Sequence, residues 1–133
     1  WVNLAIGLAL IAAAVDIVGV LINMVVLPTL ASDLSTAQIL FLAMEKMANA
    51  LTNVAAFGLY SFAGLLLLPA IFSTKDYPNW LRLLGVTEWS IASIATVLLI
   101  ISPQLATIPL LISFALYAPW VWGSAYWLLR ERA

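Results

Sequence analysis

The chain has 133 residues, of which 65% are hydrophobic and 8% are charged, and it contains neither histidine nor cysteine. A water-soluble domain of this length cannot bury so much apolar surface, because its exterior must stay largely polar. The missing residue types remove the usual ligands of haem, iron–sulfur clusters and zinc, and the net charge of −1 without a basic run argues against nucleic acid as a partner. We therefore expect one integral membrane domain, without a metal site or catalytic residues.

Four apolar stretches are long enough to cross a bilayer, which takes about 20 residues as a helix. The first covers residues 2–27 and is expected to end at Pro28. The second, 36–72, would measure roughly 55 Å as one helix and exceeds a simple crossing. We expect it to divide into an interfacial or protruding helix over 36–48 and a span over 49–71.

The last two spans are expected over 80–101 and 106–130, so the sequence predicts an all-α, four-helix transmembrane bundle. With four spans, both termini and the second loop lie on the same side of the membrane. That side holds four of the five basic residues: Lys75, Arg82, Arg130 and Arg132. Because Lys and Arg are in excess in cytoplasmic loops, we expect both termini in the cytoplasm.

Asp16 lies at the middle of the first span, and ionisable groups in hydrocarbon are costly enough to be candidates for function. Four hydroxyl groups are expected at the same depth in the other spans, those of Tyr60, Ser61, Ser93 and Tyr117. A protonated Asp16 bonded to one of them predicts a proton-binding or substrate-binding site. The alternative is a structural bond between helices, worth about 1 kcal/mol.

Glu88 is the second buried carboxylate expected from the sequence, about two turns into the third span. It shares a helix face with Ala92 and Thr96, whose small size permits close packing. Three tryptophans lie at similar depth, and an indole N–H is expected to reach the carboxylate; they are Trp89, Trp120 and Trp122. The alternative is that Glu88 reaches a water defect or a basic group of a partner subunit.

A polar stripe follows one face of the second helix, where Glu45, Asn49 and Asn53 are four residues apart. We expect Asn23 of the first span to match Asn53 in depth and to hydrogen-bond it, which would tie the two helices together. Glu45 and Lys46 are expected in the headgroup region as a solvated charged face.

The fourth span carries a Trp- and Tyr-rich face made of Tyr117, Trp120, Tyr126 and Trp127. Such a face can stack on a quinone, on a carotenoid or other pigment, or on a lipid, and it can equally serve for packing and interfacial anchoring. No cofactor is implied beyond these possibilities.

Three segments resemble a family of small bacterial multi-span membrane proteins that has no known activity. They are YPNWLRLLGV (77–86), LTNVAAF (51–57) and YWLLR (126–130). The resemblance implies a multi-pass protein of the bacterial inner membrane and assigns no site residue.

The residues together predict a non-catalytic accessory or structural subunit that packs against lipids and other membrane proteins. The alternative is a small proton-coupled transporter, or a bundle that binds a quinone, carotenoid or lipid, using Asp16 and Glu88.

Overall fold

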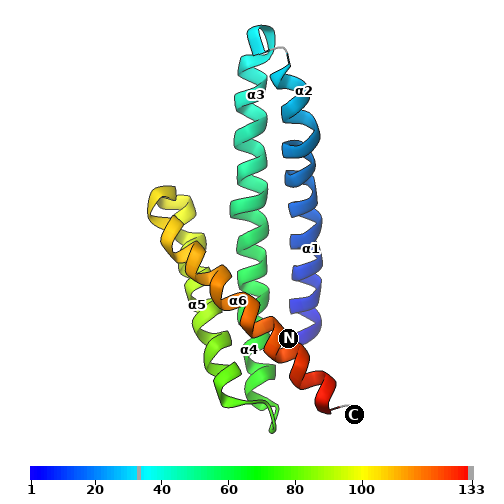
Figure 1. The fold of residues 1–133 in the computed structure, drawn as a ribbon, viewed down its shortest axis with the longest axis vertical. Helices are drawn as coiled ribbons and strands as arrows, with labels where there is room; N and C mark the ends of the chain where they lie inside the picture. The colour runs from blue at the N-terminus through cyan, green and yellow to red at the C-terminus, as the bar shows by residue number, and fades with distance from the viewer. Residues whose placement is uncertain (33, 132–133) are drawn as a thin grey trace.

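The computed structural model describes residues 1–32 and 34–131, so Arg132 lies outside the described residues. Within them the chain forms four long helices and no strand (Figure 1). The first consists of α1 (Val2–Leu21), the π-helical segment η1 (Ile22–Val26) and α2 (Leu27–Ala31). The second consists of α3 (Leu34–Asn49), the π-helical segment η2 (Ala50–Ala56) and α4 (Phe57–Ser73), and the third and fourth are α5 (Asn79–Ile101) and α6 (Pro103–Glu131).

All four helices are long and apolar enough to cross a membrane. This confirms the all-α class and the four candidate spans. The second helix is continuous through the boundary at residue 49, so the expected interfacial or protruding helix and the expected span are parts of one helix.

The first helix continues past Pro28 to Ala31, although the sequence indicated an end at residue 27. The segment η1 accounts for the difference, because the Leu27 N–H bonds to the carbonyl of Ile22, five residues earlier. Pro28 then occupies the first turn of α2, where a missing N–H costs little. The Thr29 hydroxyl donates to a carbonyl of the preceding turn at 2.7 Å.

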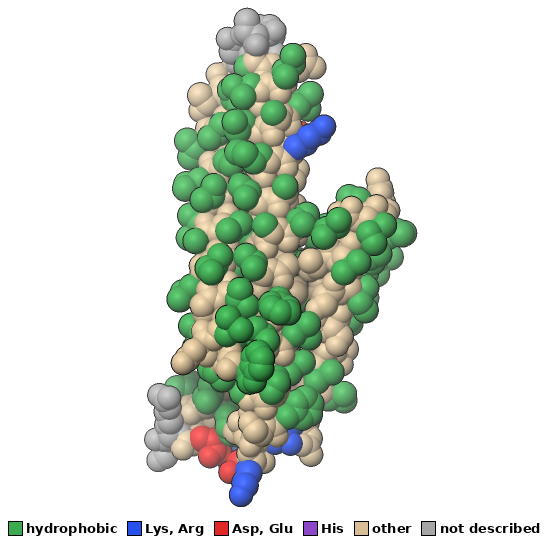
Figure 2. Space-filling model, turned by 180° about the vertical axis from the view of Figure 1, so that it is seen from behind, with side chains coloured by type: hydrophobic (Ala, Val, Ile, Leu, Met, Phe, Trp, Pro, Cys, Tyr) green, Lys and Arg blue, Asp and Glu red, His purple; other side chains and the backbone are tan. Residues whose placement is uncertain are grey.

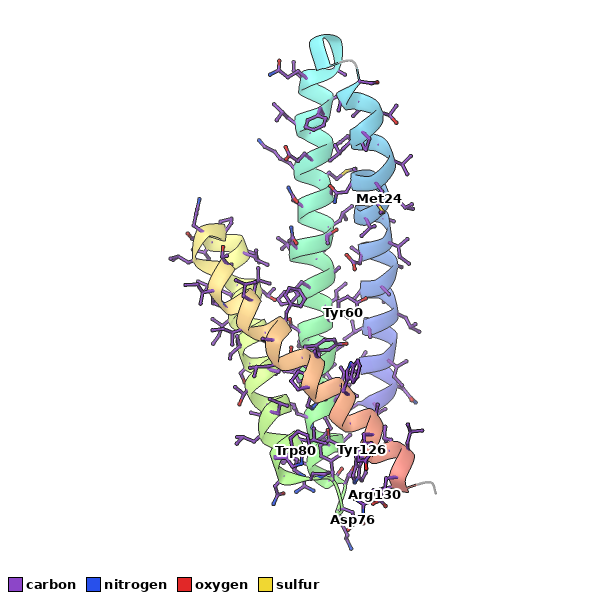
Figure 3. All side chains as sticks on the ribbon, viewed as in Figure 1. Met24, Tyr60, Asp76, Trp80, Tyr126 and Arg130 are labelled. Atoms are coloured by element: carbon purple, nitrogen blue, oxygen red, sulfur yellow. The ribbon has the colours of Figure 1, made fainter. Side chains whose placement is uncertain are left out.

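The first two helices form a long antiparallel hairpin, and α5 and α6 form a second, shorter hairpin beside its lower half (Figure 1). The helix α4 is central, with α1 on one side and α5 on the other. The N-terminus, the 74–78 loop and the end of α6 lie at the same end of the molecule. Charged side chains gather at this end and apolar ones cover most of the remaining visible surface (Figure 2), and Asp76, Trp80, Tyr126 and Arg130 are found there (Figure 3).

Small residues allow the two helices of the long hairpin to approach closely. Those buried in the interface are Ala5, Ala12 and Gly19 on the first helix and Ala48, Ala56 and Ala63 on the second. Successive residues are seven apart in the first row and eight and then seven apart in the second, where the longer interval spans the π-helical segment η2. Each interval is close to two helical turns, so each row stays on one face. A Cβ atom on Gly19 would collide with the Thr52 hydroxyl and lie 3.2 Å from the Ala48 carbonyl oxygen.

Tryptophans packed over glycines join the other helices. The indole of Trp89 on α5 lies on Gly64 of α4, where a Cβ atom would overlap the ring. Trp120 of α6 lies on Gly85 of α5, with its Nε1 atom 2.6 Å from the place of a Cβ atom. The two indoles meet edge to face, with ring centroids 5.5 Å apart, and a core of Tyr77, Leu81 and Ala92 surrounds them.

We expect Gly64→Ala to lower the free energy of unfolding by about 1–3 kcal/mol, because the added methyl group displaces the Trp89 ring. The matched control is Gly7→Ala, since nothing lies within 4 Å of a Cβ atom there. The control is expected to be neutral or to stabilise by up to about 1 kcal/mol. Equilibrium unfolding in mixed detergent micelles measures both, and equal effects would contradict the packing described.

Candidate functional site

Glu88 is the one charged residue among the buried residues that the structure describes, and it is 2% exposed. It projects from α5 toward α6, where the Ser113 hydroxyl donates to its Oε1 atom at 3.1 Å. The second oxygen, Oε2, is also buried and has no hydrogen-bond partner within residues 1–32 and 34–131. One of the two carboxyl oxygens therefore has no partner among the described residues.

The expected bond between a tryptophan and Glu88 does not form. The indole nitrogens of Trp89 and Trp120 are buried and have no partner among the described residues. Trp89 follows Glu88 directly, so it points about 100° away around α5, toward Gly64. Trp120 lies two turns from Ser113 along α6, and Trp122 is 79% exposed.

A cavity of about 230 Å³ adjoins Glu88 between α4, α5 and α6. Its lining consists of Glu88, Ser61 and Ser113 together with five aromatic residues, Phe57, Tyr60, Trp89, Phe114 and Tyr117. The rings contact one another, with centroids 5.9 Å apart for Phe57 and Phe114 and 6.0 Å apart for Trp89 and Tyr117. The site thus combines one carboxyl group with five aromatic side chains.

Hydroxyl contacts fix the helices around this cavity. Ser61 of α4 and Thr96 of α5 lie 3.3 Å apart. Ala92, between Thr96 and Glu88 on α5, is 1% exposed, as expected for a face of small residues. The Ser93 hydroxyl donates to the carbonyl of Trp89 at 2.7 Å, and Ser93 does not line the cavity.

Asp16 lies beside a second cavity, of about 180 Å³. The lining comes from three helices: Asp16 of α1, Thr52, Asn53, Ala56, Phe57 and Tyr60 of the second helix, and Leu110 and Phe114 of α6. Of the four hydroxyls expected near Asp16, only that of Tyr60 lines this cavity. Tyr60, at mid-height of the long hairpin (Figure 3), also lines the Glu88 cavity, as do Phe57 and Phe114.

The expected pair of Asn23 and Asn53 does not form. Asn53 donates its amide N–H to the Asn49 side-chain carbonyl at 3.4 Å, and η1, which holds Asn23, packs on α3 and not on η2. Gly19 is level with Ala48 and Thr52, so Asn23, one turn further, faces an earlier part of α3. The prediction assumed spans centred at equal depth, whereas the second helix is longer than the first.

The aromatic face of α6 divides between different surroundings. Tyr117 lines the Glu88 cavity and Trp120 packs with Trp89. Trp127 packs edge to face on Tyr77, with centroids 5.0 Å apart. Tyr126 is 69% exposed and lines neither cavity, so it fits interfacial anchoring.

Sequence reasoning missed Ser113, the partner of Glu88. A signal for it exists, because Ala106, Ser113 and Trp120 are seven residues apart on α6 and all three are buried. A seven-residue period marks the face that packs on a neighbouring helix. Ser113 could therefore have been chosen from the sequence as the partner of Glu88.

Comparison with known proteins finds no match: no protein-family model, curated protein or solved structure is similar to the chain. Its function is therefore inferred from the two cavities and from the exposed surfaces.

We expect Ser113→Ala to destabilise the protein by about 1–3 kcal/mol, because it removes the one hydrogen bond of a buried carboxyl group. In a Glu88→Leu background the same change should cost close to nothing, and this double-mutant cycle isolates the pair. Ser93→Ala is the matched control, since its hydroxyl bonds only within its own helix. Equal costs of Ser113→Ala in both backgrounds would contradict the pairing.

Proposed function

We propose that this chain is an integral membrane protein that binds a small organic cation at Glu88, in competition with a proton. The observation that carries the proposal is the buried Oε2 atom without a partner, in a glutamate that lines an aromatic-lined cavity. No bond is made or broken in the ligand, so the protein acts as a binding or carrier protein and not as an enzyme.

Charge balance is the first argument. A buried carboxylate in a low-dielectric surrounding must be neutralised by a proton or paired with a cation. The cavity lining contains no Lys or Arg. The neutralising charge must then come from a proton or from a ligand, and binding of one releases the other. This exchange is the elementary step of a proton-coupled carrier.

The aromatic wall is the second argument. A cation is attracted to the face of Trp, Tyr or Phe within about 6 Å, and more strongly when it is removed from water. Five aromatic side chains line the cavity together with the carboxylate. Its volume of about 230 Å³ is below the roughly 300–1,000 Å³ of sites for drug-sized ligands. A small cation therefore fits better than the quinone or carotenoid that the sequence left open.

We also propose that both termini and the 74–78 loop face the cytoplasm. Lys75, Arg82 and Arg130 lie at this end, and basic residues are enriched in cytoplasmic segments. The apolar stretch Ala37–Ser73 of the second helix has 37 residues, or about 55 Å, against a hydrocarbon thickness of about 30 Å. Its α3 portion then reaches or passes the opposite membrane surface.

We expect the purified protein to bind benzyltrimethylammonium and not neopentylbenzene, a neutral compound of the same shape. Affinity for the cation should rise with pH, because the quaternary ammonium keeps its charge while the competing proton is removed. Quenching of tryptophan fluorescence reports binding, since Trp89 lines the cavity.

Glu88→Gln keeps the shape of the side chain and should remove both the binding of the cation and its pH dependence. Asp16→Asn is the matched control, because Asp16 lines the other cavity. Cation binding that survives Glu88→Gln, or equal binding of the neutral compound, would refute the proposal.

A second candidate function, that of a subunit in a membrane protein complex, is favoured by the stripe on α3. Asn49 of α3 is exposed, and α3 packs on the first helix but on neither α5 nor α6. Amides facing hydrocarbon are costly, and they stabilise helix association when a neighbouring helix offers a partner. Large apolar side chains accompany them, such as Ile39, which is 86% exposed.

For this second function we expect native mass spectrometry in mild detergent to show a membrane protein partner. Asn49→Leu should lose the partner, because it removes the amide offered to it. Asn23→Leu makes the same chemical change in η1 and should retain the partner. Recovery of the original chain alone would count against a subunit role.

A further inference from the structure

We propose that the Asp16 cavity binds one sodium ion. The cavity brings together four side chains that carry oxygen, from Asp16 on α1, Thr52 and Asn53 on η2, and Tyr60 on α4. This site is separate from the organic-cation site at Glu88 and does not depend on it.

The donor set determines the class of ion. Carboxylate, carbonyl and hydroxyl oxygens are the ligands of hard cations, and none of the four side chains offers a sulfur or an imidazole nitrogen. Asp16 supplies a single negative charge, and no Lys or Arg lines the cavity to neutralise it. A monovalent cation balances this charge, whereas a divalent ion would leave an excess positive charge in an apolar surrounding.

Two of the oxygens are free of competing bonds. The Thr52 hydroxyl oxygen is buried and has no partner in the described part of the chain. Asn53 uses its amide N–H toward Asn49, which leaves its side-chain carbonyl available. A proton alone would neutralise Asp16 but would leave the Thr52 oxygen unpaired. An ion that gathers several oxygens satisfies both groups.

The segment η2 and Gly19 hold these residues beside the cavity. A π-helical turn holds more residues than an α-helical one, and such turns are frequent at functional sites. Gly19 allows η2 to approach α1 closely, since a Cβ atom there would collide with the Thr52 hydroxyl. Leu110 and Phe114 of α6 line the same cavity with apolar groups. Irregular helical segments near the middle of a bilayer serve as cation sites in transporters.

The test compares thermal unfolding of the purified protein in NaCl and in KCl, at fixed ionic strength and pH. We expect the midpoint to rise with sodium concentration and not with potassium, because an ion that binds only the folded state stabilises it. Asp16→Asn should abolish the sodium-dependent shift. Thr52→Val should weaken the apparent affinity for sodium about tenfold, which corresponds to about 1.4 kcal/mol.

Glu88→Gln is the matched control and should keep the full response to sodium. Tyr60→Phe removes one oxygen ligand without changing the shape of the ring. Its weaker response to sodium serves as a second test if Asp16→Asn fails to fold. An equal response to both salts, a sodium shift that survives Asp16→Asn, or a response to pH alone would overturn the proposal. If the original chain fails to bind benzyltrimethylammonium but keeps its response to sodium, only the function proposed for Glu88 is contradicted.

Discussion

Close approach of helices over small residues is the constraint on which both cavities depend. Glycine at position 19 brings η2 against α1, and the glycines at 64 and 85 each accept an indole ring. In lipid there is little hydrophobic driving force between apolar helices, so van der Waals packing and a few hydrogen bonds must hold them together. The contact at Gly64 places Trp89 on α4, and the adjacent Glu88 is then directed to Ser113 on α6. A bulkier residue at any of these three glycines would separate the helices and open the sites to lipid.

The two carboxylates have different surroundings although they lie in neighbouring cavities. The Glu88 cavity is lined by five aromatic side chains and by Ser113, which donates to the carboxyl group, whereas the Asp16 cavity is lined by three side chains that carry oxygen besides Asp16, those of Thr52, Asn53 and Tyr60. Tyr60, Phe57 and Phe114 form the wall between them. The two cavities therefore share three side chains of their lining and differ in the polar groups that complete it.

The sequence predicted the helices better than the contacts between them. Composition and stretch length were enough for four membrane-crossing helices, because hydrocarbon tolerates few alternatives. Glu88 and Asp16 could be selected as isolated charges in apolar stretches. The partner of Glu88 could not be selected from depth alone, since depth does not say which face of a helix a side chain occupies. Asn23 was misplaced because the register of a hairpin follows its small-residue contacts, here between Gly19 and Thr52, and not the midpoints of its spans.

The segment η2 has a consequence for the geometry of the whole second helix. A π-helical insertion adds one residue to an otherwise α-helical ladder, and each residue turns an α-helix by about 100°. If residues 50–56 were a regular α-helix with the same number of residues, α3 would be rotated by about that angle relative to α4. Asn49 and Phe57, which are eight residues apart, would then no longer share a face, whereas the π-helical segment keeps their faces aligned. The π-helical segment η2, which lines the same cavity as Asp16, thus sets which surface α3 presents to its surroundings.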